Sequence, residues 1–173
     1  MNIFVVADMQ NDFISGALGT AEAKLIVNGV KERAENFEGL VFFTRDTHLE
    51  DYMNTQEGEK LPEPHCIKGT WGWEICDELK EISETTEICD KPTFGSVELM
   101  ESIKELGLEE EIESITLLCL CTDICVISNA MLLKAALPET KIIVDGTLSA
   151  GVTPISHKNA LEAMKMCQIE VIE

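Results

Sequence analysis

Cys125 follows an apolar run at the point where a strand pattern changes into a helical one. The run Ile115–Leu120 favours a buried strand, and residues 124–136 have helical spacing. Thr122 is a good N-cap and Asp123 suits a first turn, so we expect the Cys125 sulfur near the positive end of a helix dipole. Because that field favours thiolate over thiol, we predict that Cys125 is a nucleophile. The alternative is a buried cysteine that acts only as a small hydrophobe.

Two further strand patterns end at residues that handle protons or charge. Asp8 follows the apolar run Ile3–Ala7, and Lys91 follows a weaker strand pattern. Functional groups gather at the carboxyl ends of strands in an open parallel sheet. We therefore expect Asp8, Lys91 and Cys125 to converge on one crevice. Taken singly, Asp8 would also suit a strand-end cap, and Lys91 would suit an exposed loop.

A second group of polar residues has the chemistry of metal ligands. Asp46 and His48 stand two residues apart, so both side chains leave the same side of an extended backbone. His65 lies near the far end of a long irregular segment, Arg45–Trp73, which we expect to roof the crevice. Two imidazoles and one carboxylate with open positions suit Zn or Fe. The alternative is that these are strand-end and turn residues without a metal.

Composition limits the classes of protein to which the chain can belong. Its 173 residues and 45% hydrophobic content suit one domain, residues 1–173, with a sizeable core. A formal net charge of -19 argues against nucleic acid and against anionic membrane surfaces as partners. No secretory signal pattern or membrane-spanning apolar stretch is present. The odd number of cysteines, seven, favours reduced thiols and a cytoplasmic location.

Strand and helix patterns alternate along the chain. Alternation of this kind is typical of a parallel sheet with helices on both faces, joined by right-handed crossovers. The sequence therefore predicts an α/β, doubly wound Rossmann-like layer, and no Gly-x-Gly-x-x-Gly follows the first strand. The expected strands are Ile3–Ala7, Leu40–Thr44, Thr86–Cys89, Ser114–Leu120, Lys141–Val144 and Gln168–Ile172, and the expected helices are 20–36, 96–106, 123–136 and 156–167.

Five ordered motifs together carry a resemblance to a known family. Each motif is weak alone, but their order and spacing resemble the isochorismatase-like cysteine hydrolases, and most of all their nicotinamidase branch. The resemblance implies a single-domain, three-layer Rossmann-like fold with about six parallel strands. The motifs are Asp8–Phe13, Asp46–His48, His65–Thr70, Lys91–Phe94 and Thr122–Val126.

The resemblance implies an amide hydrolysis that proceeds through a thioester. Cys125 would attack the carbonyl, Asp8 would act as the general base, and Lys91 would hold Asp8 and supply positive charge. The backbone N–H groups of Cys121 and Cys125 would form the oxyanion hole, with a cis peptide at Leu120–Cys121. The chain departs from the family at Cys119, where relatives usually have glycine.

The resemblance also implies one divalent metal per chain, with Zn as our first expectation and Fe or Mn as alternatives. Asp46, His48 and His65 would bind it, and the candidates for a fourth ligand are Asn54, Glu57 and Glu59, of which we favour Glu57. Phe13 matches one aromatic wall for a substrate ring. Pro62 occupies the place of the second wall, and the residues that would substitute for it are Trp71, Trp73 and Tyr52.

The expected function is that of a cytoplasmic amidohydrolase that converts nicotinamide and water to nicotinate and ammonia. We expect a small-molecule amide substrate and, by family analogy, a homo-oligomer. Two alternatives remain open. One is another amidase or ureido-hydrolase of the same superfamily that needs no metal, and the other is a non-catalytic metal-binding or assembly module. We expect His157, at a helix start, to be a surface residue.

Overall fold

The computed structural model describes residues 1–173, and its centre is a six-stranded parallel sheet. The strand order is β3-β2-β1-β4-β5-β6, so the predicted α/β doubly wound fold is confirmed. The central strands β1 and β4 are almost wholly apolar because helices cover both of their faces. The strands are β1 (Asn2–Ala7), β2 (Leu40–Asp46), β3 (Glu87–Lys91), β4 (Ser114–Leu120), β5 (Lys141–Ala150) and β6 (Glu170–Ile172).

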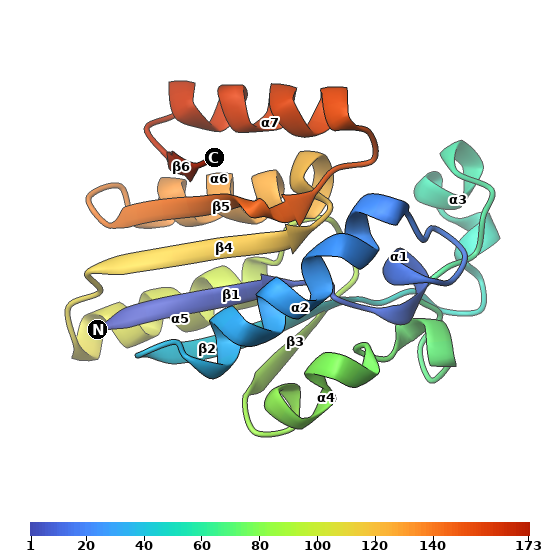
Figure 1. Ribbon diagram of the computed structural model, residues 1–173, viewed down its shortest axis with the longest axis horizontal. Coiled ribbons are helices and arrows are strands. Elements are labelled where there is room, and N and C mark those ends of the chain that lie inside the picture. Colours follow the sequence, from blue (N-terminus) through green and yellow to red (C-terminus); the bar gives the residue numbers. More distant parts are fainter.

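Helices form a layer on each side of the sheet (Figure 1). Alternate residues of β1 enter opposite cores: Phe4 and Val6 pack with α1, α2 and α4, whereas Ile3 and Val5 pack with α5, α6 and α7. The result is the predicted three-layer arrangement. The helices are α1 (Asn11–Ile14), α2 (Ala21–Glu35), α3 (Gln56–Lys60), α4 (Asp77–Ser83), α5 (Val97–Glu109), α6 (Ile127–Ala136) and α7 (Pro154–Met166).

Side-chain caps fix where the three longest helices begin. The hydroxyl of Thr20 accepts a hydrogen bond from Ala23 N at the start of α2, and the hydroxyl of Ser96 accepts one from Leu99 N at the start of α5. Thr153 forms a capping box at the start of α7, where Pro154 occupies the first turn. These local signals explain why the predicted helix starts lie close to the observed ones.

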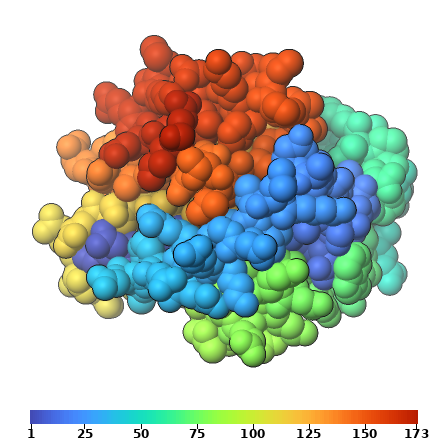
Figure 2. Space-filling view, in the orientation of Figure 1, coloured from blue at the N-terminus to red at the C-terminus, as the bar shows by residue number.

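The chain reverses its winding direction between β1 and β4. β1 pairs with β2 on one side and with β4 on the other, and Ala7 lies opposite Cys119 in the register. Residues that follow these two strands therefore meet at a topological switch point, where open α/β sheets bind their ligands. The segment between β2 and β3 extends beyond this end of the sheet, and Figure 2 shows it beside the residues that follow β1.

Several element boundaries differ from those predicted. The helix expected at 123–136 begins as one π-helical turn, Thr122–Val126, before α6. Cys121 occupies the N-cap position without a side-chain cap, so the prediction of Thr122 as N-cap was wrong. β5 runs to Ala150 instead of Val144 because a register shift in its pairing with β4 lets the strand continue. No helix is long and apolar enough to cross a membrane.

Candidate active site

Three strand ends bring a carboxylate, an ammonium and a thiol together. Asp8 follows β1, Lys91 is the last residue of β3, and Cys125 lies in the π-helical turn after β4. Lys91 Nζ lies 2.7 Å from Asp8 Oδ2 and 3.3 Å from Cys125 Sγ. All three side chains are buried. The structure thus brings together the three residues that the sequence marks as candidates for catalysis.

Asp8 is held so that one of its carboxylate oxygens stays available. The Thr44 hydroxyl donates a 2.6 Å hydrogen bond to Asp8 Oδ1. Asp8 Oδ2 accepts no well-aligned hydrogen bond, so its contact with Lys91 is an ion pair. An oxygen that accepts no well-aligned hydrogen bond keeps a lone pair that is able to receive a proton from a neighbouring thiol. This geometry is compatible with the role of general base that we predict for Asp8.

Burial sets the protonation states of this cluster. Burial raises the pKa of Asp8, and the Lys91 ammonium opposes that rise without cancelling it. Burial alone would lower the pKa of Lys91, but Asp8 and Cys125 raise it well above its usual value. Burial and the charge of Asp8 raise the pKa of the Cys125 thiol well above its usual value, and Lys91 only partly offsets them. Cys125 is therefore a thiol at neutral pH, which corrects the thiolate expected from the helix dipole.

The hydrogen bond from Thr44 predicts a shift in pH dependence. This bond stabilises the Asp8 carboxylate, so Thr44→Val should raise the pKa of Asp8 further. A bond to a charged group is worth about 1.5 kcal/mol, or about one pH unit. We expect the acidic limb of the kcat/KM profile to move upward in pH by about that amount, because more base is needed to deprotonate Asp8.

Thr44→Ser is the matched control, since it keeps the hydroxyl and should keep the wild-type profile. A limb that moves downward in Thr44→Val, or moves equally in both variants, would contradict the assignment of Asp8 as the titrating base. The apparent pKa of the acidic limb belongs to the whole group of interacting residues. It is therefore compared between variants and not with the pKa of free aspartate.

The turn after β4 positions the backbone around Cys125. The Leu120–Cys121 peptide is cis, in agreement with the resemblance. Cys119 has φ 96°, a region that favours glycine, which is the residue that the resemblance implied at this position. Cys121 O accepts hydrogen bonds from Ile124 N and Val126 N, and both Cys121 and Cys125 line the same cavity. The backbone N–H groups of these two residues stay our candidates for the oxyanion hole.

Asp46, His48, Glu57 and His65 form a second cluster beside the first. Their ligand atoms all lie within 4.8 Å of one another. His48 Nε2 lies 2.9 Å from Asp46 Oδ2 and 3.7 Å from Glu57 Oε1. His65 Nε2 lies 3.5 Å from Asp46 Oδ2 and 3.8 Å from Glu57 Oε1. The other two candidates for a fourth ligand, Asn54 and Glu59, are exposed and lie outside this cluster.

The donor set of this cluster fits a divalent metal ion. His65 Nδ1 lies 2.8 Å from the Glu63 carbonyl, which only accepts, so Nδ1 carries a proton and Nε2 is the nitrogen that faces the cluster. Burial would raise the pKa of Asp46, but hydrogen bonds from His48 and His65 lower it. Burial and the nearby Asp46 raise the pKa of Glu57. Two carboxylates and two imidazoles in a tight group satisfy a borderline cation such as Zn.

Asp46 connects the two clusters. Its Oδ2 atom faces the histidines, and its Oδ1 atom lies 3.4 Å from Lys91 Nζ. Gln10 fixes the backbone of Asp46 from both sides, because Oε1 accepts from Asp46 N at 2.7 Å and Nε2 donates to Asp46 O at 2.8 Å. The orientation of Asp46 is thus set before any ligand binds.

Cys125 and the four residues of the second cluster line one cavity of about 650 Å³, and Asp8 and Lys91 lie buried behind Cys125. Phe13 contributes an aromatic wall as predicted from the sequence, and Phe94, 44% exposed, contributes a second aromatic ring at the same cavity. The segment between β2 and β3 covers part of the cavity, as expected for a roof. The lining residues are Phe13, Leu18, Thr20, Asp46, His48, Thr55, Gln56, Glu57, Lys60, Leu61, His65, Pro92, Thr93, Phe94, Cys121, Ile124, Cys125 and Val152.

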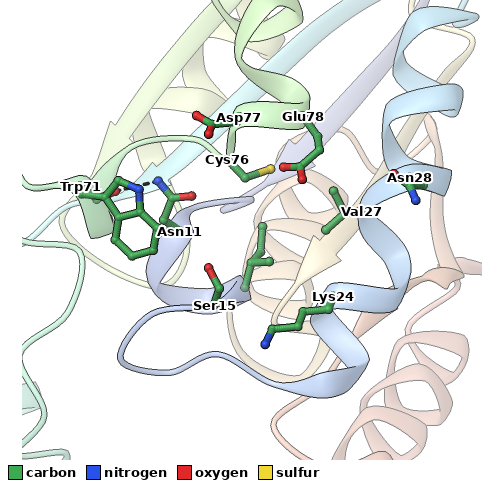
Figure 3. Close-up of a pocket in the computed structure, with 10 residues that line it drawn as sticks. Asn11, Ser15, Lys24, Val27, Asn28, Trp71, Cys76, Asp77 and Glu78 are labelled. Atoms are coloured by element: carbon green, nitrogen blue, oxygen red, sulfur yellow. Dashed lines mark hydrogen bonds between the residues drawn. The ribbon is translucent and has the colours of Figure 1, made fainter.

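The three aromatic residues considered as a second wall lie outside this cavity. Trp71 is 57% exposed and borders a separate hollow of about 350 Å³ between α1, α2 and α4, as Figure 3 shows. Trp73 stacks on the Arg45 guanidinium and donates a hydrogen bond to Thr47 Oγ1. Tyr52 is buried behind His48 and His65 and donates a hydrogen bond to Leu61 O. Pro62 does not line the cavity either.

Sequence reasoning missed four residues that support the site. Phe94 and Gln10 lie within motifs that carry the resemblance, so a signal for both was present. Asn129 donates a 2.8 Å hydrogen bond to Cys125 O, and its signal is a polar residue inside an apolar helix. Thr44 gave no signal, because threonine is an ordinary strand residue. His157, expected on the surface, is half-buried and lies 2.8 Å from the Thr122 hydroxyl through Nδ1.

The isochorismatase domain model matches residues 2–173, so the chain belongs to the isochorismatase family of hydrolases. The nicotinamidase of Saccharomyces cerevisiae is 25% identical over 122 residues, a match that spans 53% of this chain and 56% of that protein. This chain therefore spans about half the length of that curated relative.

Solved structures resemble the whole chain. A nicotinamidase/pyrazinamidase from Bacillus subtilis has a TM-score of 0.79 at 26% identity and covers 99% of each chain. A pyrazinamidase from Pyrococcus horikoshii, solved in complex with zinc, has a TM-score of 0.80 at 24% identity and covers 99% of this chain and 98% of that one. The resemblance derived from the motifs is thereby confirmed at the level of the family.

Proposed function

We propose that this protein is a cysteine amidohydrolase that acts on a pyridine carboxamide, with nicotinamide as the substrate to test first. The observation that carries the proposal is that Cys125 and the four candidate metal ligands line one cavity, while the buried Lys91 joins Cys125 and Asp8 to Asp46. The first cluster suits acyl transfer to sulfur, and the second suits binding of a ring nitrogen.

Proton transfer by Asp8 accompanies each bond change in the proposed reaction. Asp8 takes the thiol proton as the Cys125 sulfur attacks the amide carbon, and the carbonyl oxygen becomes an oxyanion that accepts from the backbone N–H groups of Cys121 and Cys125. Asp8 then protonates the nitrogen, the C–N bond breaks, and ammonia leaves. Water attacks the remaining thioester with Asp8 as its base, which releases the carboxylate product and restores the thiol.

Lys91 keeps Asp8 effective throughout this cycle. Its ammonium lies 2.7 Å from Asp8 Oδ2 and stays charged because its pKa is raised. A fixed positive charge limits how far burial raises the pKa of Asp8, which favours the carboxylate form that accepts the thiol proton. The same charge lies 3.3 Å from the Cys125 sulfur and stabilises the negative charge that develops there.

Asp46, His48, Glu57 and His65 would hold one divalent metal, with Zn proposed from their donor types. A bound metal would supply Lewis acidity and an open coordination position for a ring nitrogen. The protein itself orients the ring: Phe13 and Phe94 line the cavity and offer aromatic faces, while Lys60 and Gln56 offer polar contacts. Such orientation brings the amide carbon toward Cys125.

The metal site predicts one divalent ion per chain in metal-replete wild-type protein. His48→Ala and His65→Ala should each lose most of it, because each removes one of four clustered ligands. Glu57→Gln should weaken metal binding. Glu59→Gln should not, because Glu59 is exposed and lies outside the cluster. Elemental analysis of the purified variants measures the stoichiometry. Full occupancy in both histidine variants, or none in the wild type, would leave these residues structural.

Ammonia release tests the proposed activity. We expect turnover of nicotinamide and pyrazinamide by the metal-replete protein and little turnover of carbamoylated amines or ureido acids. Removal of the metal should raise KM or lower kcat for the pyridine carboxamide. Preference for a ureido acid or an aliphatic amide, with no effect of metal removal, would instead identify a metal-independent amidase of the same family.

The cysteine chemistry supports a reducing compartment, and we propose the cytoplasm. All seven cysteines are free thiols. Apart from Cys125, five of the other six are buried or half-buried, and none forms a disulfide. An oxidising compartment would put the Cys125 nucleophile at risk of oxidation.

A further inference from the structure

The turn that carries Cys125 depends on a side chain from a distant helix. Thr122 lies in this turn, between Cys121 and Cys125, and its side chain is completely buried. Its hydroxyl lies 2.8 Å from Nδ1 of His157, a residue of α7 that is 35 positions away in the chain. A buried hydroxyl needs a partner, and this imidazole supplies it.

The helix that presents His157 is itself rigidly placed. Thr153 Oγ1 accepts from Ser156 N at 3.0 Å, and Ser156 Oγ accepts from Thr153 N at 3.0 Å, so the first turn of α7 is capped in both directions. Gly151 lets the chain pass directly against the imidazole residue, because a Cβ there would lie 2.9 Å from His157 Cα and Cβ. Such close packing leaves His157 little freedom to move away.

A second bond joins the same two segments. The Asp123 carboxylate accepts from Val152 N at 3.1 and 3.3 Å, and Val152 lines the cavity. The β5–α7 connection and α7 thus hold the turn at two successive residues: Val152 contacts Asp123, and His157 contacts the hydroxyl of Thr122. The contact at Asp123 is exposed, whereas the contact at Thr122 is partly buried and its threonine is fully buried.

We propose that His157 is a positioning residue that fixes the Thr122 hydroxyl and, through it, the backbone donors of Cys121 and Cys125 toward the oxyanion. This inference rests on the proposed function, because it concerns the oxyanion of that reaction. Preorganised donors help only if they are aimed at the transition state before it forms. A shift of the turn should therefore lower the rate more than it weakens ground-state binding.

Substitutions at His157 separate this role from simple packing. Asn places a polar atom where Nδ1 stands and is able to donate or accept, whereas Gln places its polar atoms near the Nε2 position. We expect His157→Ala and His157→Gln to lower kcat for nicotinamide by about tenfold or more with KM nearly unchanged. His157→Asn should recover most of the loss, and Lys158→Ala, at the exposed neighbour, should behave as wild type.

A pyridine-3-carbaldehyde gives a readout that turnover does not. Cys125 sulfur adds to its carbonyl carbon, the C=O π bond becomes a C–O single bond, and the thiol proton passes to that oxygen, so no oxidant or leaving group is needed. The adduct is tetrahedral and reports on the oxyanion donors, whereas nicotinate reports on the ground state. His157→Ala should weaken the aldehyde about tenfold and leave nicotinate binding within about twofold.

The outcomes distinguish the inference from the proposed function. Absence of amide hydrolysis in the wild type would contradict the proposed function alone, and aldehyde affinity would still test the role of His157. Equal loss of aldehyde and nicotinate affinity in His157→Ala, or no rescue by His157→Asn in a variant with wild-type Tm, would overturn the positioning role. Additive losses in His157→Ala and Thr122→Val would also overturn it, because one hydrogen bond joins the two residues.

Discussion

Cys125→Ala should reduce amide turnover by roughly 10⁴-fold or more while leaving the fold in place. The variant lacks the only sulfur within 3.3 Å of Lys91 Nζ, so no thioester can form. It deletes a single buried atom and keeps the backbone N–H that we assign to the oxyanion hole, so the loss of stability should be about 1 kcal/mol. Steady-state ammonia release and thermal unfolding measure the two effects.

Cys89→Ala is the matched control because Cys89 is also buried but lies away from the cavity. It should lose some stability and keep its turnover. Substantial amide hydrolysis in Cys125→Ala, or an equal fall in both variants, would mean that another residue is the nucleophile. Cys125→Ser should be nearly as inactive as the alanine variant, since Asp8 would then have to deprotonate a far weaker acid.

The strands that carry the site were predictable because both faces of the sheet are covered. Buried parallel strands are continuous apolar runs, and their ends are marked by the first polar residue, as at Asp8 after β1. Since parallel strands end at the same edge, the meeting of Asp8, Lys91 and Cys125 followed from sequence order alone. Lys91 was expected just beyond its strand and proved to be its last residue.

Long-range contacts set the features that were not predictable. The π-helical turn at Thr122–Val126 has no sequence period of its own, and the hydroxyl of Thr122 bonds to His157 instead of capping α6. The placement of Trp73 depends on Arg45 and Thr47, whose contacts with the indole ring hold it away from the cavity. Local residue types determine which side chains are available, but tertiary packing decides which surface each one reaches.

Electrostatics were the least predictable part of the site. The position of Cys125 near the start of a helical segment favoured a thiolate, yet burial and the charge of Asp8 raise its pKa well above the usual value. The sequence did not determine whether the pKa of Asp8 is raised or lowered, because burial raises it and the Lys91 ammonium lowers it. Complete burial decides it in favour of a raised pKa.

Asp8→Asn and Lys91→Ala should each lower kcat by about 10³-fold or more, with a much smaller change in KM. Asn has no carboxylate to receive the thiol proton, so the first step loses its base. Without Lys91, the pKa of Asp8 rises further and the developing charge on Cys125 loses its counter-ion. Both losses fall on the transition state and not on substrate binding.

The double variant Asp8→Asn/Lys91→Ala should be only slightly slower than the worse single variant. The 2.7 Å ion pair couples the two residues. Once the Asp8 carboxylate is gone, the Lys91 ammonium can no longer act by lowering the pKa of that base. Removing Lys91 alone also leaves the Asp8 carboxylate buried without its partner, which should lower the Tm, and Asp8→Asn in the same chain should restore part of that loss. Measuring kcat and Tm for the wild type, the two single variants and the double variant completes this double-mutant cycle. Losses in kcat that multiply across the two sites would show that Asp8 and Lys91 act independently, and Lys91 would then be a substrate-binding or structural residue.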